Sequence, residues 1–322
     1  MKEKNLSIEL LKFLAVIVVL NSHMDAIYGR YAFLATGGAI GDALFFFVSG
    51  FTLFLGRLGR FDNWYKRRIR RIYPTVFTWG ALMSFMDIKQ LTVKQIILNG
   101  GGWFVSCIMI YYVVLYFVKK YSEHKPLLPL ISLCIVILAW YSFEERTSLF
   151  MYGDTYFKWL FNFLFMLVGA YVGNNTIHLR PSFLMDACMF CLSIVIFYLF
   201  LFVVERTPIL INIQVFSLFP LLCVIIYAYK LCLAPCLVKI MTTKFGNCLR
   251  VIAGLCLEAY IVQVSLIPII AKSDFLPTQS KVIVTIVLIF VAAYITRCFS
   301  RLFVQLFQNE DFDWKHVAEL AE

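Results

Sequence analysis

The chain has 322 residues, a formal net charge of +10, 61% hydrophobic residues and only 15% charged residues. A soluble domain of this length carries about 25% charged residues, so the sequence has too little polar surface to coat a water-soluble globule. This composition excludes an ordinary soluble enzyme, a secreted disulfide scaffold and a disordered chain. It favours an all-α polytopic membrane protein.

Ten apolar segments are each close to the ~20 residues that a helix needs to cross a bilayer. The first follows Lys2 and Lys4 without a small-residue cleavage site, so we interpret it as a membrane helix and not as a signal peptide. The chain ends are short, which predicts a single transmembrane domain over 1–322 without a separate soluble domain. In chain order the segments are 6–23, 39–56, 73–88, 103–118, 127–143, 159–173, 183–204, 211–230, 251–271 and 281–303.

The basic residues predict the orientation of these segments. If the N terminus is cytoplasmic, the inside segments hold 20 of the 29 lysines and arginines, and the outside segments hold 8. The positive-inside rule therefore predicts that both termini are cytoplasmic. The basic residues lie between apolar runs, so we expect lipid and not nucleic acid as a partner. The cysteines lie mostly within those runs, and no Cys/His spacing predicts a metal site.

The first segment contains charged residues, Glu9 and Lys12, and ends at His23. A charge inside a span is costly and indicates function by default. Eleven residues of helix make three turns and about 20°, so Lys12 and His23 share a face about 16 Å apart along the axis. Glu9 precedes Lys12 by three residues, a spacing that allows an ion pair. The alternative is a snorkelling lysine and an interfacial histidine.

The second region begins with Asp42, at the start of segment 39–56, and continues into five basic residues in six positions, Lys66 to Arg71. We name Arg67, Arg68, Arg70 and Arg71 the arginine cluster. Pro74 predicts the start of the next helix, because proline is tolerated in a first turn. Guanidinium forks bind phosphates bidentately. The alternative is an ordinary positive-inside cluster that touches anionic lipid.

Together these regions resemble the acyltransferase 3 family of integral membrane proteins, which move acyl groups, most often acetyl, onto carbohydrates. The family's first-helix signature is Arg, ten residues and His, and this sequence has Lys12, ten residues and His23. Its second-helix phrase, an acidic residue before FFxxSGF, is similar to Asp42 through Phe51. Further similarities are the RxxR pairs Arg67–Arg70 and Arg68–Arg71 before Tyr73, the pair Trp103–Phe104, and Leu257 through Gln263.

The resemblance implies an acetyl-CoA-dependent reaction, about ten membrane helices and no metal. It implies catalytic roles for His23, Lys12 and Glu258, and substrate binding by Asp42 and Trp103. It also implies that the arginine cluster, Lys12 and Tyr73 bind the cofactor. Two departures stand out: Lys12 keeps the charge of the usual arginine but lacks its planar fork, and Gln263 stands where a late histidine is common.

Glu258 is a further intramembrane acid, and we expect it to face a cavity or a cation such as Lys12 and not lipid. The alternative for this residue is a structural ion pair.

The expected product is an O-acetylated glycan, either lipid-linked or at the cell surface, made at the bacterial cytoplasmic membrane. We expect the phosphates of acetyl-CoA to bind the arginine cluster and the pantetheine arm to run along the polar face of the first helix. His23 then acts as a general base on a sugar hydroxyl or as a nucleophile that carries the acetyl group. The alternative function is a transporter or exporter of a polysaccharide, although no inverted repeat is visible. The oligomeric state is left open.

Overall fold

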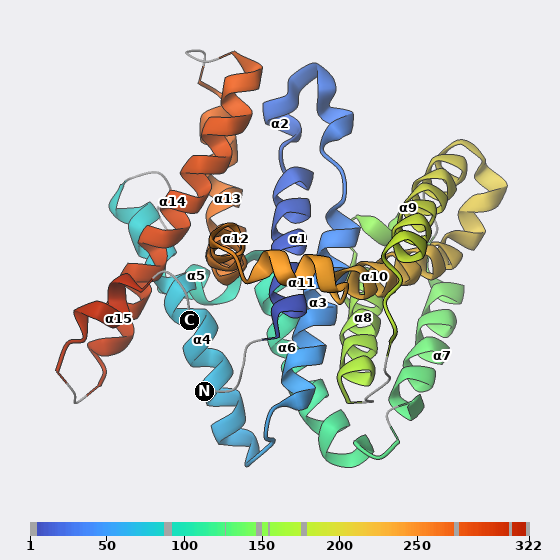
Figure 1. Cartoon of the computed structure of the whole chain (residues 1–322), viewed down its shortest axis with the longest axis horizontal. Helices are drawn as coiled ribbons and strands as arrows, with labels where there is room; N and C mark the ends of the chain where they lie inside the picture. The colour runs from blue at the N-terminus through green and yellow to red at the C-terminus, as the bar shows by residue number, and fades with distance from the viewer. Residues whose placement is uncertain are drawn as a thin grey trace. The chain divides into compact units, whose positions relative to one another are not determined.

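The computed structural model describes residues 5–86, 92–125, 127–145, 150–153, 155–174, 179–273, 277–308 and 311–319. Within these ranges the chain is helical and contains no strand, which confirms the predicted all-α class (Figure 1). Apolar runs form helices in a membrane because every backbone polar group must be bonded within its own segment. The long helices are α1 (Leu6–Ser22), α3 (Gly38–Leu55), α4 (Phe61–Phe85), α6 (Gly102–Ser122), α7 (Leu127–Phe143), α8 (Tyr156–Asn174), α9 (Phe183–Arg206), α10 (Leu218–Cys232), α13 (Cys256–Ala271) and α14 (Thr278–Gln305).

Short elements connect the long helices. Those that begin or extend a bend are α2 (Asp25–Tyr28), the 3-10 turn η1 (Gly29–Leu34) and α12 (Lys244–Gly254). The others are α5 (Val93–Asn99), η2 (Phe150–Tyr152), η3 (Pro208–Ser217), α11 (Pro235–Met241) and α15 (Trp314–Ala318).

The described helices fit a protein that crosses a membrane several times. Six of them are long and apolar enough to span a bilayer, and the number rises to eight if each of two bent pairs is one span. The first pair joins α1 to α2 and η1 at 57°, and the second joins α12 to α13 at 65°. The remaining two predicted segments correspond to α7, which is apolar but short, and to α4, which carries the arginine cluster.

Helix α4 differs from its prediction. It begins at Phe61, so the basic run is helical and not a loop, and Pro74 lies inside the helix and not at its start. The buried apolar residues of α4 fall on one face across the whole length, which makes a single amphipathic helix. That packing outweighs the one backbone hydrogen bond that proline removes. The last two residues of predicted segment 73–88 lie outside the described residues. The buried residues are Trp64, Ile72, Val76, Trp79 and Met83.

The chain forms two compact units that interleave along the sequence. Unit 1 comprises Met1–Ala15, Ala39–Leu58 and Val114–Gly246, and unit 2 comprises Val16–Gly38, Gly59–Val113 and Asn247–Glu322. Unit 1 therefore holds most of α3 and the helices from α7 to α11. Unit 2 holds α4, α5, the start of α6 and the helices from α13 to α15.

Glycine sets the packing of α3 on α8 in unit 1. A Cβ placed on Gly50 would lie 1.8 Å from the carbonyl oxygen of Met166, and one on Gly169 would lie 1.9 Å from that of Phe47. Since Phe51 meets Gly173 one turn later, the two helices run in the same direction. Small residues allow such backbone contact between membrane helices.

The core of unit 2 is built on α4, α13 and α14, which pack against one another. The indole Nε1 of Trp79 on α4 donates to Ser265 Oγ on α13 at 3.3 Å. Thr75 and Ser300 place their hydroxyl oxygens 3.4 Å apart between α4 and α14. These side-chain bonds satisfy polar groups that would otherwise be unpaired between apolar helices.

Candidate active site

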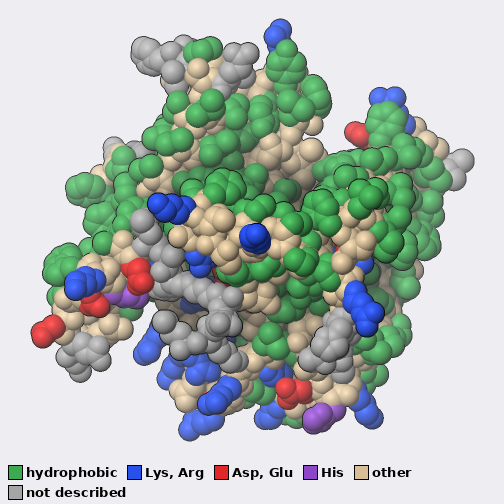
Figure 2. Space-filling model, in the orientation of Figure 1, with side chains coloured by type: hydrophobic (Ala, Val, Ile, Leu, Met, Phe, Trp, Pro, Cys, Tyr) green, Lys and Arg blue, Asp and Glu red, His purple; other side chains and the backbone are tan. Residues whose placement is uncertain are grey.

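The arginine cluster lies on the first half of α4, in unit 2. Arg67, Arg70 and Arg71 are exposed, whereas Arg68 is half-buried. Among the described residues, no carboxylate lies within ion-pairing distance of these four guanidinium groups. Figure 2 shows lysine and arginine side chains gathered around the end where α4 begins, on a surface that is otherwise largely hydrophobic. The cluster is thus a group of cations available to an external anion.

Arg68 is held by aromatic rings. Its guanidinium carbon lies 5.0 Å from the ring centroid of Trp64 and 6.0 Å from that of Tyr112 on α6. Its buried Nε has no hydrogen-bond partner in the described part of the chain. Burial lowers the pKa of the Arg68 guanidinium, but arginine stays charged at physiological pH. Cation–π contacts fix the plane of this side chain and leave its donors for a ligand.

Tyr73 lies on the same helix, half-buried, with its ring 6.4 Å from that of Phe77. The structure places it within one turn of Arg70 but adds no further polar contact that points to a cofactor.

His23 follows the last residue of α1, and its side chain is exposed. Its backbone N–H still donates to the Leu20 carbonyl at 3.3 Å, so the residue continues the helical turn. The chain then bends into α2, which packs against α13 and α14 (Figure 1). An exposed imidazole at a fixed helix end is suited to proton transfer with a substrate.

Asn21 fixes the bend beside His23. Its Nδ2 donates to the carbonyl oxygens of Leu34 at 2.8 Å and Thr36 at 3.0 Å, and its Oδ1 accepts from the Tyr28 hydroxyl at 2.7 Å. These bonds tie η1 and the following loop to the end of α1. Sequence reasoning missed Asn21, although an amide inside an apolar span is a signal that it has partners.

Lys12 forms the predicted ion pair. Its Nζ lies 2.8 Å from Glu9 Oε1, and the two side chains are 21% and 15% exposed. Both residues belong to the part of α1 in unit 1. The pair confirms the three-residue spacing argument.

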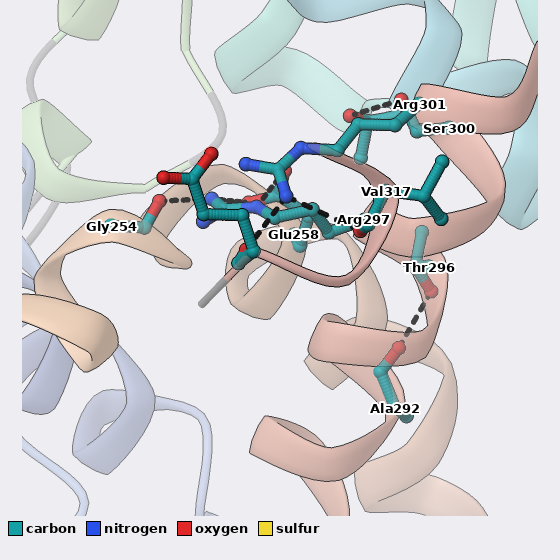
Figure 3. Close-up of polar contacts among 10 residues, drawn as sticks. Gly254, Glu258, Ala292, Thr296, Arg297, Ser300, Arg301 and Val317 are labelled. Atoms are coloured by element: carbon teal, nitrogen blue, oxygen red, sulfur yellow. Dashed lines mark hydrogen bonds and ion pairs between the residues drawn. The ribbon is translucent and has the colours of Figure 1, made fainter. Parts of the chain in front are cut away.

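Glu258 also pairs with a cation, and that cation is Arg297 of α14 (Figure 3). Arg297 Nε donates to Oε1 at 3.3 Å, and Nη2 donates to Oε2 at 2.9 Å. Nη2 also donates to the Gly254 carbonyl at the end of α12. Glu258 therefore pairs with Arg297, whereas Lys12, the cation that we expected, pairs with Glu9. The bonds of Arg297 to Glu258 and to Gly254 fix the bend between α12 and α13. This geometry favours the structural alternative for Glu258.

Trp103 is the second residue of α6, after the glycine that begins the helix. Gly102 has φ +62°, a left-handed conformation that favours glycine. The Trp103 ring is half-buried and meets the Phe104 ring edge-on, and Phe104 lies 4.7 Å from the Tyr260 ring of α13. Gln263, one turn beyond Tyr260, is 1% exposed, and its Nε2 has no partner among the described residues.

Asp42 lies in the first turns of α3 and is 8% exposed. Its Oδ2 is 4.0 Å from Lys158 Nζ on α8, in unit 1. Sequence reasoning counted Lys158 only as an orientation signal.

Unit 2 contains eight of the ten predicted site residues: His23, the four residues of the arginine cluster, Tyr73, Trp103 and Glu258. Lys12 and Asp42 belong to unit 1. Two further charged residues of unit 1 were missed. Lys119 of α6 is 6% exposed and donates to the carbonyls of Phe54 and Gly56, which end α3. Asp186 of α9 is fully buried and pairs with Lys230 of α10.

The described residues contain no group of three or more His, Cys, Asp or Glu side chains that could hold a metal ion. A protein-family model described as an acyltransferase domain matches residues 5–298, which is nearly the whole chain. Searches of the curated proteins and of the solved structures gave no match.

Proposed function

The chain belongs to the acyltransferase 3 family, and from this premise we propose that it moves an acetyl group from cytoplasmic acetyl-CoA to a hydroxyl of a surface or lipid-linked glycan. The family and the apolar helices make it a multi-pass membrane acyltransferase. The exporter alternative is not favoured, since the match to an acyltransferase domain covers residues 5–298, nearly the whole chain. The proposed setting is the bacterial cytoplasmic membrane, with ten spans, both termini inside and one domain.

The observation that carries the donor assignment is the arginine cluster, which has no carboxylate partner among the described residues. Acetyl-CoA carries phosphates, and arginine forks match phosphate oxygens. The Nε of Arg68 has no partner among the described residues and provides a donor already oriented by Trp64 and Tyr112. The cluster follows the second predicted segment, on the side that the positive-inside rule assigns to the cytoplasm. These features fit a binding site for the nucleotide end of the donor.

His23 is the proposed general base. The hydroxyl oxygen of the acceptor forms a new bond to the acyl carbon while the carbon–sulfur bond of the thioester breaks. His23 takes the hydroxyl proton and returns it to the departing thiolate, so that the products are an ester and a free thiol. Imidazole suits this role because its charge changes near neutral pH. Trapping an acetyl group on His23 in the absence of acceptor would support the nucleophile alternative.

The deciding experiment uses purified protein in detergent and acetyl-CoA labelled in the acetyl group. We expect saturable binding and slow release of acetate without acceptor. In producing cells, NMR of the surface glycan is expected to show O-acetyl groups that disappear when the gene is deleted. No binding of acetyl-CoA, together with unchanged glycan, would refute the proposed function.

A further inference from the structure

A second polar cluster lies inside unit 1, where α3 packs against α8. Asp42 and Lys158 form a loose pair there at 4.0 Å, with side chains only 11% and 16% exposed. Asn162 follows Lys158 by four residues, so it lies on the same face of α8, one turn further along. We name Asp42, Lys158 and Asn162 the α3–α8 polar cluster. Its members come from two helices whose backbones touch at Gly50 and Gly169.

The Asn162 side chain has no hydrogen-bond partner in the part of the chain that the structure describes. It is 1% exposed, and neither its Oδ1 nor its Nδ2 forms a hydrogen bond with any described residue. A buried amide without partners has lost its hydrogen bonds to water and has formed no others in their place, and such groups are rare in folded proteins. Lipid tails cannot supply a donor or an acceptor. The site therefore calls for an added group that both donates and accepts hydrogen bonds.

We propose that the α3–α8 polar cluster binds hydroxyl groups of the carbohydrate acceptor, an inference that rests on the proposed function. A hydroxyl donates one hydrogen bond and accepts others, which matches an amide that offers one oxygen and one N–H₂ group. Asp42 supplies an acceptor and Lys158 a donor for a neighbouring hydroxyl. Sites built around substrate hydroxyls discriminate strongly, since a missing hydroxyl leaves the buried polar groups unpaired.

The direction of the two helices supports this location. α3 and α8 run in the same direction, and they correspond to the second and sixth predicted segments, which both enter from the outside when the N terminus is cytoplasmic. Asp42 and Lys158 lie in the first turns of these helices. The cluster is thus at the extracytoplasmic end of each helix, on the side where a surface glycan lies.

The test is Asn162→Leu, which keeps the size of the side chain and removes both polar atoms. The variant loses no bond to another described residue, so its melting temperature in detergent is expected to equal or exceed that of the wild type. Its affinity for acetyl-CoA is expected to be unchanged. O-acetylation of the surface glycan in producing cells is expected to fall by about tenfold or more, as loss of the hydrogen bonds to the acceptor requires.

Ser193→Ala is the matched control. Ser193 is a buried polar residue of α9 in the same unit, and its hydroxyl bonds the Met189 carbonyl in its own helix. It is expected to retain full acetylation. Asn162→Ser keeps one hydroxyl, and we expect a level of acetylation between those of the wild type and Asn162→Leu. If the leucine variant does not accumulate in the membrane, the serine variant alone tests the proposal.

Wild-type acetylation in Asn162→Leu, or in Asn162→Ser if it stands alone, would overturn the inference and assign the site to a trapped water. Failure of the proposed function is a separate result, because there the wild-type protein itself binds no acetyl-CoA and acetylates no glycan.

Discussion

His23 is the residue on which the proposed chemistry depends. We expect His23→Ala to reach the membrane in normal amounts, because the side chain is exposed. Transfer of acetyl groups is expected to fall by about 10²–10⁴-fold, the usual effect of losing a general base. The measurement is glycan O-acetylation by NMR against membrane content by immunoblot. Full acetylation in this variant would remove His23 from the mechanism.

Lys12 offers a test of charge in the first half of α1. Lys12→Met keeps the length of the side chain and leaves Glu9 without its partner at 2.8 Å. We expect lower activity, and also lower thermal stability, because breaking this half-buried pair leaves the charge of Glu9 uncompensated. Lys12→Arg restores the residue that the family usually has and is expected to keep partial activity. A fully active methionine variant would show that Lys12 only snorkels.

Substitution of the arginine cluster can distinguish a role in membrane topology from a role in binding acetyl-CoA. Changing Arg67, Arg68, Arg70 and Arg71 to lysine preserves the positive-inside signal, so membrane orientation is expected to be unchanged. Lysine lacks the bidentate fork and does not stack as arginine does between Trp64 and Tyr112, so affinity for acetyl-CoA is expected to fall. Isothermal titration measures this. Wild-type affinity in the quadruple variant would leave the cluster as a topology signal and move the donor site elsewhere.

At the residue scale, local spacing was enough to predict some contacts and not others. The pair of Glu9 and Lys12 follows from three residues of helix. The partner of Glu258 does not, since Arg297 lies on another helix and is brought close only by the packing of α13 on α14. In the sequence, Arg297 contributes only to the basic residues predicted on the cytoplasmic side. The contacts of Asp186 and Lys119 could not be predicted from local spacing either, because the partner of each lies on a segment distant in the sequence.

At the element scale, hydropathy located most of the long helices within a few residues, since the bilayer fixes their length. It placed the start of α10 too early, because a 3-10 segment, Pro208–Ser217, precedes that helix. It misplaced the start of α4, where an amphipathic helix continues through a basic run and a proline. Hydropathy does not detect such helices, because their mean composition is polar. The bends after Ser22 and Gly254 were likewise not predicted, as side-chain contacts from Asn21 and Arg297 hold them.

The contact of α3 with α8 is expected to be intolerant of added volume. A methyl group at Gly50 or Gly169 would overlap backbone carbonyls at less than 2 Å, so the helices must move apart. We expect Gly50→Ala and Gly169→Ala each to destabilise the protein by about 1–3 kcal/mol, the usual cost of overpacking. Thermal unfolding in detergent measures this.

Gly56→Ala is the control for this experiment. A Cβ at Gly56 comes no closer than 3.4 Å to another atom, which is an ordinary contact. We expect the melting temperature of this variant to match that of the wild type. Equal melting temperatures for Gly50→Ala and Gly56→Ala would contradict the backbone contact between α3 and α8.

At the scale of the whole molecule, the family and the helices agree on a multi-pass acyltransferase, while the count of ten spans depends on α4, α7 and the two bent pairs. The basic residues are more numerous in the connecting segments predicted on one side of the membrane. That bias predicts that the connection between the eighth and ninth segments faces the cytoplasm. Cys236 of α11 and Cys248 of α12 lie in this connection and are exposed, so they report its side directly.

A membrane-impermeant maleimide therefore tests the topology. In intact cells with a permeabilised outer layer, Cys236 and Cys248 are expected to stay unlabelled until the inner membrane is opened, because they face the cytoplasm. Arg206→Cys places a thiol at the exposed end of α9, on the opposite predicted side, and is expected to react before opening. Mass spectrometry of the labelled peptides reads both results from one sample. Labelling of Cys236 or Cys248 before the inner membrane is opened would show that the predicted orientation is wrong. The arginine cluster would then not face the cytoplasm.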